Sequence, residues 1–308
     1  MGAEAHEDVA ATEAGLLGGA AGAHAGEEHT LLIRRAGVVG DGAERGVEAA
    51  EIADGGGRGS DLLARVLWAI PAIIVAIFLV VQGGAIFAVG VLALGIVCLH
   101  ELYAMFERFH PVRLGGFIAV AGVVAAALYG SPIQILMAFA AGFLVIFLLT
   151  LAGPLRSGAT MAIAITLLGV LWIGLPLAYA VLLRRLPHGD GIVVDVLVGT
   201  FIGDTAAYLG GRAFGQRPLA PAISPNKTLE GLLIGIVIGA VAVWFAGLYQ
   251  DWLSGWDALL LGVCVAAVAP LGDLFESLIK RDADTKDTGK LFGAHGGALD
   301  RLDAVLFA

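Results

Sequence analysis

Apolar residues form long continuous runs along most of this chain, and short polar segments separate the runs. A helix that crosses the roughly 30 Å hydrocarbon core of a bilayer needs about 20 mostly apolar residues. Runs of about this length lie at residues 66–82, 84–105, 114–129, 133–152, 159–182, 191–210, 231–249 and 257–278. We therefore predict an all-α fold, a polytopic transmembrane helical bundle of about eight spans. The apolar stretch at 302–307 indicates the start of a truncated ninth span.

The overall composition also indicates a membrane protein. The mean hydropathy is +0.89, 58% of the residues are hydrophobic and only 15% are charged. These values lie far outside the range of soluble globular domains. Cys98 and Cys264 lie within apolar runs, where they are explained as small buried hydrophobic side chains, so we expect neither a disulfide nor a metal site from them.

The first 61 residues differ in kind from the rest of the chain. They are rich in Gly, Ala and Glu and poor in aromatic residues, so they cannot bury enough apolar surface to offset the entropy of ordering. Residues 1–63 contain 12 acidic and 4 basic side chains and so account for −8 of the net charge of −9. We predict a disordered acidic tail at 1–61, followed by a membrane-embedded domain at 62–308. No basic segment followed by a short apolar core opens the chain, so we expect no cleaved signal peptide.

Basic side chains are distributed unevenly among the short loops. With the tail inside, the outer loops hold only Arg184 and Arg185. The inner loops then hold Arg65, Arg108, Arg113, Arg156, Arg212, Arg217, Lys227, Lys280, Arg281, Lys286, Lys290 and Arg301. Since basic residues collect on the cytoplasmic side, we expect a multi-pass protein of the cell (inner) membrane whose active site faces the cytoplasm. The polar segments 211–230 and 279–303 are two crossings apart, so they share one face and can build one site.

The first polar segment follows a carboxylate that lies inside an apolar run. An ionised Asp204 is expensive there unless it is paired or bound to a metal. An ion pair with a basic residue of a neighbouring helix is the simplest alternative. Further on, Ser-Pro-Asn-Lys-Thr-Leu-Glu at 224–230 predicts a helix start that Ser224 or Thr228 can cap. A helix start beside Lys227 also suits phosphate, so capping and anion binding both stay open.

The second polar segment begins at the end of the last long apolar run. Asp273, Glu276 and Lys280 follow i, i+3, i+7 spacing and share one helix face. A simple Glu276–Lys280 ion pair would explain part of this pattern, but it does not explain Asp273 inside the apolar run. Asp300 and Asp303 add two more carboxylates at helical spacing.

The carboxylates and cations of these two segments suit phosphate groups and a hard divalent cation. Mg²⁺ is usually held by one or two carboxylates together with substrate phosphate oxygens, while lysine and arginine bind polyphosphate. The chain contains no Walker A loop, zinc motif or nucleophile elbow. We therefore expect no covalent serine or cysteine intermediate.

The last of these motifs resembles the signature of the phosphatidate cytidylyltransferase family, also called CDP-diacylglycerol synthases. That signature runs Ser-x-apolar-Lys-Arg, four residues, Lys-Asp, then His-Gly-Gly and Asp-Arg-x-Asp. The matching positions are Ser277, Lys280, Arg281, Lys286, Asp287, His295, Gly296, Gly297, Asp300, Arg301 and Asp303. The stretches 204–208 and 224–231 resemble the same family, and the resemblance covers about residues 64–308. One departure is Ala298, where the family usually has a larger aliphatic residue.

The resemblance implies transfer of the cytidylyl group of CTP to the phosphate of phosphatidic acid, with pyrophosphate and CDP-diacylglycerol as products. It implies Mg²⁺ as a cofactor, with a second cation as an option. The expected partners are CTP, phosphatidic acid and the lipid bilayer, with a homodimer as a further option. No nucleic acid is expected.

On this basis each polar residue receives a role. Asp273 and Asp300 are the expected metal ligands, with Asp303 as a further ligand and Asp204 and Glu276 as supporting or alternative ones. The expected catalytic residues are Asp273, Lys280, Asp300 and Asp204. The expected substrate-binding residues are Ser224, Lys227, Arg281, Lys286, His295, Gly296, Gly297 and Arg301. For His295, a phosphate contact and a purely structural role both stay open.

Two other functions share some of these features. A membrane kinase that uses CTP to phosphorylate a lipid alcohol would need similar carboxylates and cations, and it would release CDP instead of pyrophosphate. A transporter would suit several spans with intramembrane acids, and Glu101 beside His100 in the second run is its best support. The charges gather on one face, which favours an enzyme.

Overall fold

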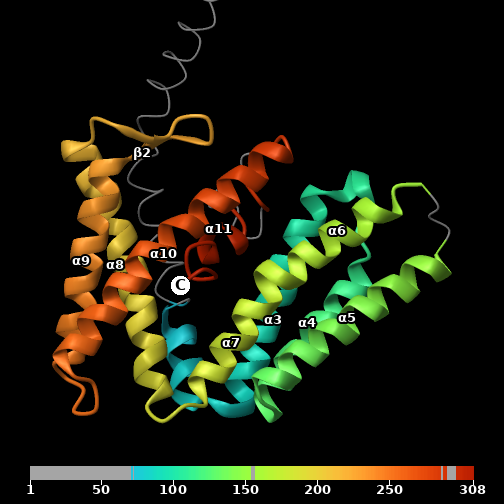
Figure 1. The fold of residues 1–308 in the computed structure, drawn as a ribbon, viewed down its shortest axis with the longest axis horizontal. Coiled ribbons are helices and arrows are strands. Elements are labelled where there is room, and N and C mark those ends of the chain that lie inside the picture. Colours follow the sequence, from blue (N-terminus) through green and yellow to red (C-terminus); the bar gives the residue numbers. More distant parts are fainter. Residues whose placement is uncertain (1–70, 72, 154–156, 286, 290–295) are drawn as a thin grey trace, which may run out of the picture. The chain divides into compact units, whose positions relative to one another are not determined.

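The computed structural model describes residues 71–308 apart from residues 72, 154–156, 286 and 290–295. The tail predicted for 1–61 lies outside these residues. The helices are α3 (Gly84–Met105), α4 (Arg113–Tyr129), α5 (Pro132–Ala152), α6 (Ala159–Gly169), α7 (Leu175–Arg184), α8 (Gly189–Phe214), α9 (Leu229–Gly247), α10 (Gly255–Asp282) and α11 (Leu299–Leu302). The structure also describes a helix at Ile73–Gln82, a 3₁₀ turn at Glu107–Phe109, a π-helical turn at Val170–Gly174 and the strands β1 (Pro218–Ala220) and β2 (Ser224–Thr228) (Figure 1).

The helices confirm an all-α membrane protein. Among the described residues, six helical segments are long and apolar enough to cross a membrane: α3, α5, the continuous segment Ala159–Arg184, α8, α9 and α10. Two shorter apolar helices, Ile73–Gln82 and α4, lie at two further predicted positions. The predicted count of eight spans is therefore not confirmed. Large apolar side chains on the outside of these helices, such as Phe143 and Leu148 on α5, are exposed, as expected where lipid surrounds the protein.

The described helices pack in two groups (Figure 1). Helices α3, α4, α5, α6 and α7 contact one another around a buried core that includes Leu99, Tyr103, Val120 and Ile146. Helices α8, α9 and α10 form the second group, in which α9 packs against both of the others. The candidate site residues lie on the second group, on the hairpin between α8 and α9, and on the chain after α10, which includes α11 and contacts α3.

Small residues let the helices of the second group approach closely. A Cβ added at Gly235 of α9 would lie 2.8 Å from the carbonyl oxygen of Gly203 on α8. A Cβ at Gly239 would lie 3.0 Å from the Gly199 oxygen and 2.8 Å from the Cβ of Ala266 on α10. Glycine and alanine at these contacts therefore bring the three backbones together, as is common between membrane helices.

A short β-hairpin connects α8 to α9. Strands β1 and β2 pair antiparallel, with Pro218 opposite Thr228. Glu230 closes the hairpin by accepting hydrogen bonds from the backbone N–H groups of Gln216 (3.0 Å) and Arg217 (3.1 Å). Thr228 is the N-cap of α9, because its hydroxyl accepts a hydrogen bond from Gly231 N at 3.2 Å. Of the two capping residues proposed from the sequence, Thr228 is therefore correct, whereas Ser224 lies in β2.

The end of the chain folds back onto α10. After α11, residues 303–307 form turns, and the rings of Phe275 and Phe307 lie 5.6 Å apart. Gly272 makes this return possible, because a Cβ there would collide with the carbonyl oxygen of Asp303. The ninth span predicted to begin at 302–307 is not seen in these residues, since their backbone turns back onto a helix that is already in place.

Candidate active site

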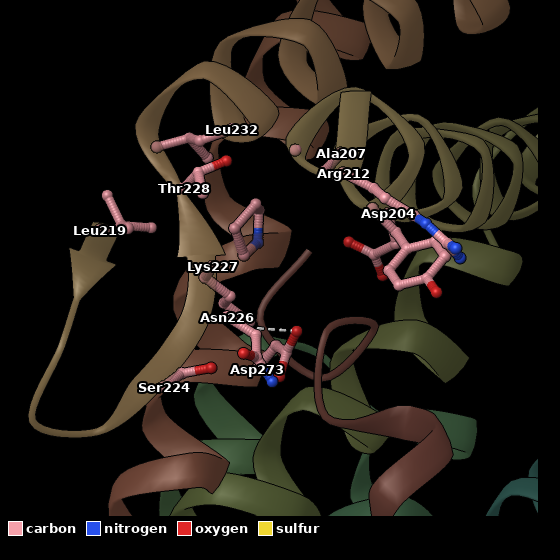
Figure 2. A pocket seen from close by; sticks show the side chains of 13 residues that line it. Asp204, Ala207, Arg212, Leu219, Ser224, Asn226, Lys227, Thr228, Leu232 and Asp273 are labelled. Carbon is pink, nitrogen blue, oxygen red and sulfur yellow. Dashed lines mark ion pairs between the residues drawn. The ribbon is translucent and has the colours of Figure 1, made fainter. Parts of the chain in front are cut away.

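A cavity of about 580 Å³ lies between α8, β2, the start of α9 and α10. This volume is typical of small-molecule sites. Figure 2 shows the side chains that surround it. They are Asp204, Ala207, Tyr208, Gly211, Arg212, Leu219, Ser224, Asn226, Lys227, Thr228, Leu232, Pro270 and Asp273. The first predicted polar segment, 211–230, lines this cavity together with Pro270 and Asp273 of α10. None of the described residues of the second segment, 279–303, is among the lining residues, and its contact with the first is that of Arg281 Nε with the Ile223 carbonyl oxygen at 3.5 Å.

An ion pair between Lys227 and Asp273 connects the two walls of this cavity (Figure 2). Lys227 extends from β2 and Asp273 from α10. The ammonium nitrogen of Lys227 is buried, and apart from its ion pair with Asp273 it makes no hydrogen bond to any part of the chain that the structure describes. Its three N–H donors, set against one carboxylate, leave capacity to bind the oxygens of a phosphate.

Asp204 brings a second carboxylate to the same cavity. It lies on α8, and its charge interacts with those of Asp273, Asp303 and Lys227. Within the described ranges Asp204 forms no ion pair, so the simple helix-to-helix pair that the sequence left open is not seen there. Asp204 is thus attracted by Lys227 and repelled by Asp273 and Asp303, and a cation bound near these carboxylates would relieve the repulsion.

A second cluster of charges lies where α10 meets α11. The Lys280 ammonium lies 3.0 Å from Asp300 Oδ1 and 3.5 Å from Glu276 Oε2. The i, i+4 ion pair that the sequence suggested as the simplest alternative is therefore present, and Asp300 joins it. Glu276 is only 1% exposed, and its Oε1 has no hydrogen-bond partner in the described part of the chain. A buried charge of this kind depends on its ion pair for stability.

Asp300 organises the backbone around it. Its carboxylate accepts hydrogen bonds from the N–H groups of Gly297 (2.6 Å) and Thr288 (3.1 Å) as well as from Lys280. Burial by itself would raise the pKa of Asp300, but the Gly297 hydrogen bond and the contacts with Glu276 and Lys280 lower it below its usual value. Asp300 is therefore ionised at neutral pH. Gly296, with a φ of +80°, supplies the left-handed backbone conformation of this turn.

Asp303 links the two clusters. It is 9% exposed, and its charge interacts with that of Asp273 on one side and that of Lys280 on the other. Burial is the main cause that raises the pKa of Asp303, and the neighbouring negative charge of Asp273 adds to it despite a favourable contact with Glu276. Asp303 thus interacts electrostatically with a residue of the cavity and with a residue of the second cluster.

The donor set fits a hard divalent cation only in part. No three His, Cys, Asp or Glu side chains converge closely enough to hold a metal ion by themselves in the ranges that the structure describes. Mg²⁺ needs fewer protein ligands, because substrate phosphates and water complete its shell. Asp273, 37% exposed and lining the cavity, fits this requirement best. Both oxygens of Asp300 already accept hydrogen bonds, so its role as a metal ligand stays a prediction.

The remaining predicted residues are placed as follows. Ser224 lines the cavity, whereas Arg281 is exposed and its Nε lies 3.5 Å from the Ile223 carbonyl oxygen at the hairpin turn. Gly297 is buried beside Asp300, and Arg301 is exposed on α11. Lys286 and His295 lie outside the described residues, so their predicted roles stay predictions.

The structure adds residues to which the sequence gave no role at this site. Tyr208, Arg212 and Asn226 line the cavity. Tyr208 and Arg212 lie at i+4 and i+8 from Asp204, so one face of a helix carries all three, a signal that was readable from the sequence. Glu101 is the second addition, because it accepts hydrogen bonds from the segment that carries Asp300.

The fold and the comparisons with known proteins define the class to which this protein belongs: multi-pass membrane enzymes that transfer nucleotidyl groups. A model of the cytidylyltransferase family matches residues 63–308. The chain belongs to this family, which confirms the resemblance seen in its motifs.

The relatives of the chain agree with this assignment. A phosphatidate cytidylyltransferase of Bacillus subtilis (strain 168) is 34% identical over 258 residues, which cover 80% of this chain and 94% of the relative. One of Mycobacterium leprae (strain TN) is 36% identical over 156 residues, 51% and 50% of the two chains. One of Helicobacter pylori (strain ATCC 700392 / 26695) is 45% identical over 121 residues, 39% and 44% of the two chains.

Proposed function

We propose that this protein is a CTP:phosphatidate cytidylyltransferase that makes CDP-diacylglycerol and pyrophosphate for phospholipid biosynthesis. One observation carries the proposal. The Bacillus subtilis relative of that name matches 80% of this chain, and the matched region contains a polar cavity at the ends of membrane helices. A lipid phosphate and a water-soluble nucleotide can meet only at such a boundary, because the acyl chains stay in the bilayer.

The reaction is an in-line displacement at phosphorus. An oxygen of the phosphatidate phosphate attacks the α-phosphorus of CTP, a new P–O bond forms, and the bond to the β-phosphate oxygen breaks. The leaving pyrophosphate takes the electron pair of that bond. Catalysis of such a step consists of holding both substrates in line and stabilising the negative charge on the oxygens.

The side chains of the cavity divide this work between them. Lys227 and Arg212 line the cavity, where they would bind phosphate oxygens. Ser224 donates a hydrogen bond to the same groups. Arg281, beside the hairpin turn, and Arg301 bind the outer phosphates of the nucleotide. We place the substrate contacts predicted for Lys286 and His295 in the same region.

Asp273 would hold Mg²⁺, with Asp204 and Asp303 beside it and Asp300 as a further ligand. The ion would supply Lewis-acid stabilisation of charge on the phosphate oxygens. Lys280 neutralises Glu276 and Asp300, which keeps these carboxylates from repelling the triphosphate. We place this face of the protein in the cytoplasm, where CTP is available, since the loops at this end carry most of the basic residues.

Transport is not proposed. Glu101, the best support for ion coupling, accepts backbone hydrogen bonds from residues 298 and 299 and so has a structural explanation.

Product analysis tests the function directly. Purified protein is incubated in detergent–lipid micelles with CTP, Mg²⁺ and phosphatidic acid, and pyrophosphate and lipid-linked cytidine are measured. We expect both products in equal amounts, and neither without phosphatidic acid. Release of CDP with a phosphorylated lipid would instead show a CTP-dependent kinase.

A further inference from the structure

Glu101 is a buried carboxylate that the proposed chemistry does not use. It lies near the end of α3 and is 6% exposed. Its Oε1 accepts a hydrogen bond from Ala298 N at 3.0 Å, and its Oε2 accepts one from Leu299 N at 2.9 Å. The hydroxyl of Thr288 lies 3.4 Å from Oε2 and donates to it as well. A side chain from the first helix group thus holds the backbone of the last segment of the chain.

Two glycines make room for this carboxylate. A Cβ added at Gly289 would lie 2.7 Å from Glu101 Oε1, and one added at Gly297 would collide with Oε2. Both glycines are therefore required for the backbone to approach Glu101 this closely. Gly297 was predicted as a substrate-binding residue; in the structure it lets the backbone approach an acidic side chain, and its contact with substrate stays a prediction.

Thr288 connects Glu101 to the candidate site. Its hydroxyl donates to Glu101, while its backbone N–H donates to Asp300. Asp300 in turn binds Lys280, which pairs with Glu276. One network therefore runs from Glu101 of α3 through Thr288 and Asp300 to Lys280 and Glu276 of α10. Thr288, Ala298 and Leu299 are all buried, so the hydrogen bonds of this network are shielded from water and costly to break.

We propose that Glu101 is a positioning residue, which fixes residues 297–303 so that Asp300 and Asp303 face Lys280 and Asp273. It acts through the backbone of this segment. A carboxylate suits this task, since its two oxygens accept N–H groups from consecutive residues at once. Glutamine has one acceptor oxygen and would turn an N–H donor toward one of those backbone N–H groups. The proposal rests on the proposed function only for its kinetic test.

Hydrogen exchange tests the contact without any substrate. In the full-length protein in detergent, we expect Glu101→Gln to increase the exchange rate of amides in the peptide 297–303 at least tenfold. Helix α4 should exchange at the wild-type rate. Thr166→Val is the matched control, because it removes another buried side-chain acceptor of a backbone N–H, that of Val112 (2.8 Å). It should leave 297–303 unchanged. Unaltered exchange of 297–303 in Glu101→Gln would overturn the proposal.

Kinetics test the effect on the site. We expect Glu101→Gln to lower kcat about 10- to 100-fold and to raise the Mg²⁺ concentration needed for half-maximal rate, whereas Thr166→Val changes neither. Thr288→Val is a milder second variant for the case that Glu101→Gln does not fold, and it should change kcat and the Mg²⁺ requirement in the same directions.

Wild-type kcat and Mg²⁺ dependence in the folded variants would refute the positioning role. If the wild-type protein makes no lipid-linked cytidine, the proposed function fails, and the exchange experiment still decides about Glu101.

Discussion

Lys227 on β2 forms an ion pair with Asp273 on α10, although α9 and most of α10 lie between them in the chain. The pair joins the first polar segment to α10 at the cavity that we propose as the active site. Because Asp273 is the one ion-pair partner of the Lys227 ammonium in the described part of the chain, this ammonium has N–H donors left for a substrate phosphate. The predictions below follow from this arrangement.

Asp273→Asn should strongly reduce the metal-dependent reaction while the protein stays folded. The change removes the negative charge that would hold Mg²⁺ but keeps the size of the side chain. We expect kcat/KM to fall about 10²- to 10³-fold, the typical cost of losing one electrostatic group of an active site. Incorporation of labelled CTP into lipid measures this. Asp257→Asn, in the first turn of the same helix, is the control and should keep wild-type activity. Full activity of Asp273→Asn would remove Asp273 from the metal site.

Lys227→Gln should weaken the handling of the triphosphate. The substitution removes the positive charge that faces the cavity and leaves a side chain that can still form hydrogen bonds. We expect a higher KM for CTP together with a lower kcat, because an ammonium group binds phosphate in both the ground and transition states. Steady-state kinetics with varied CTP measures both. An unchanged KM and kcat would show that CTP binds elsewhere.

Lys280→Met should destabilise the protein through Glu276. The variant leaves an almost fully buried carboxylate without its cation, and breaking such a pair costs about 3–5 kcal/mol. The double variant Lys280→Met with Glu276→Gln should recover much of the thermal stability in detergent, but not the activity. If Lys280→Met is as stable as the wild type, the Glu276–Lys280 ion pair does not stabilise the fold.

Gly235→Ala should loosen the contact between α8 and α9. The added methyl group would lie 2.8 Å from the Gly203 carbonyl oxygen and from the Cβ of Ala207, so the helices must separate. We expect a loss of about 1–3 kcal/mol, as in other overpacked contacts. Gly122→Ala is the matched control, since no atom lies within 4 Å of its added Cβ. Equal melting temperatures of the two variants would contradict the close packing.

The sequence predicted the helical membrane fold well. In lipid, a continuous apolar run of about 20 residues can satisfy its backbone hydrogen bonds within itself by forming a helix. It also placed both polar segments on one face, since an even number of crossings separates them. It did not predict the hairpin at 218–228. The residues there are compatible with a helix start, and only Thr228 acts as the cap while Glu230 closes the strands.

The partners of individual charges were less predictable. Glu101 and Asp300 are far apart in sequence. Nothing in the sequence around either residue shows that both accept a hydrogen bond from Thr288. The metal-ligand role of Asp300 stays a prediction, and its hydrogen bonds with the backbone N–H groups of Gly297 and Thr288 were not foreseen from the sequence. Spacing reveals which residues share a helix face, but it does not reveal which backbone segment returns to contact them.

A double-mutant cycle on kcat/KM between Lys227→Gln and Asp273→Asn tests most directly whether the two segments form one site. Our account predicts that the double variant loses much less than the product of the two single losses, because each substitution disrupts the same cluster. The coupling should be about 0.5–3 kcal/mol. Losses that simply multiply would show that the two residues act independently and would contradict a shared site.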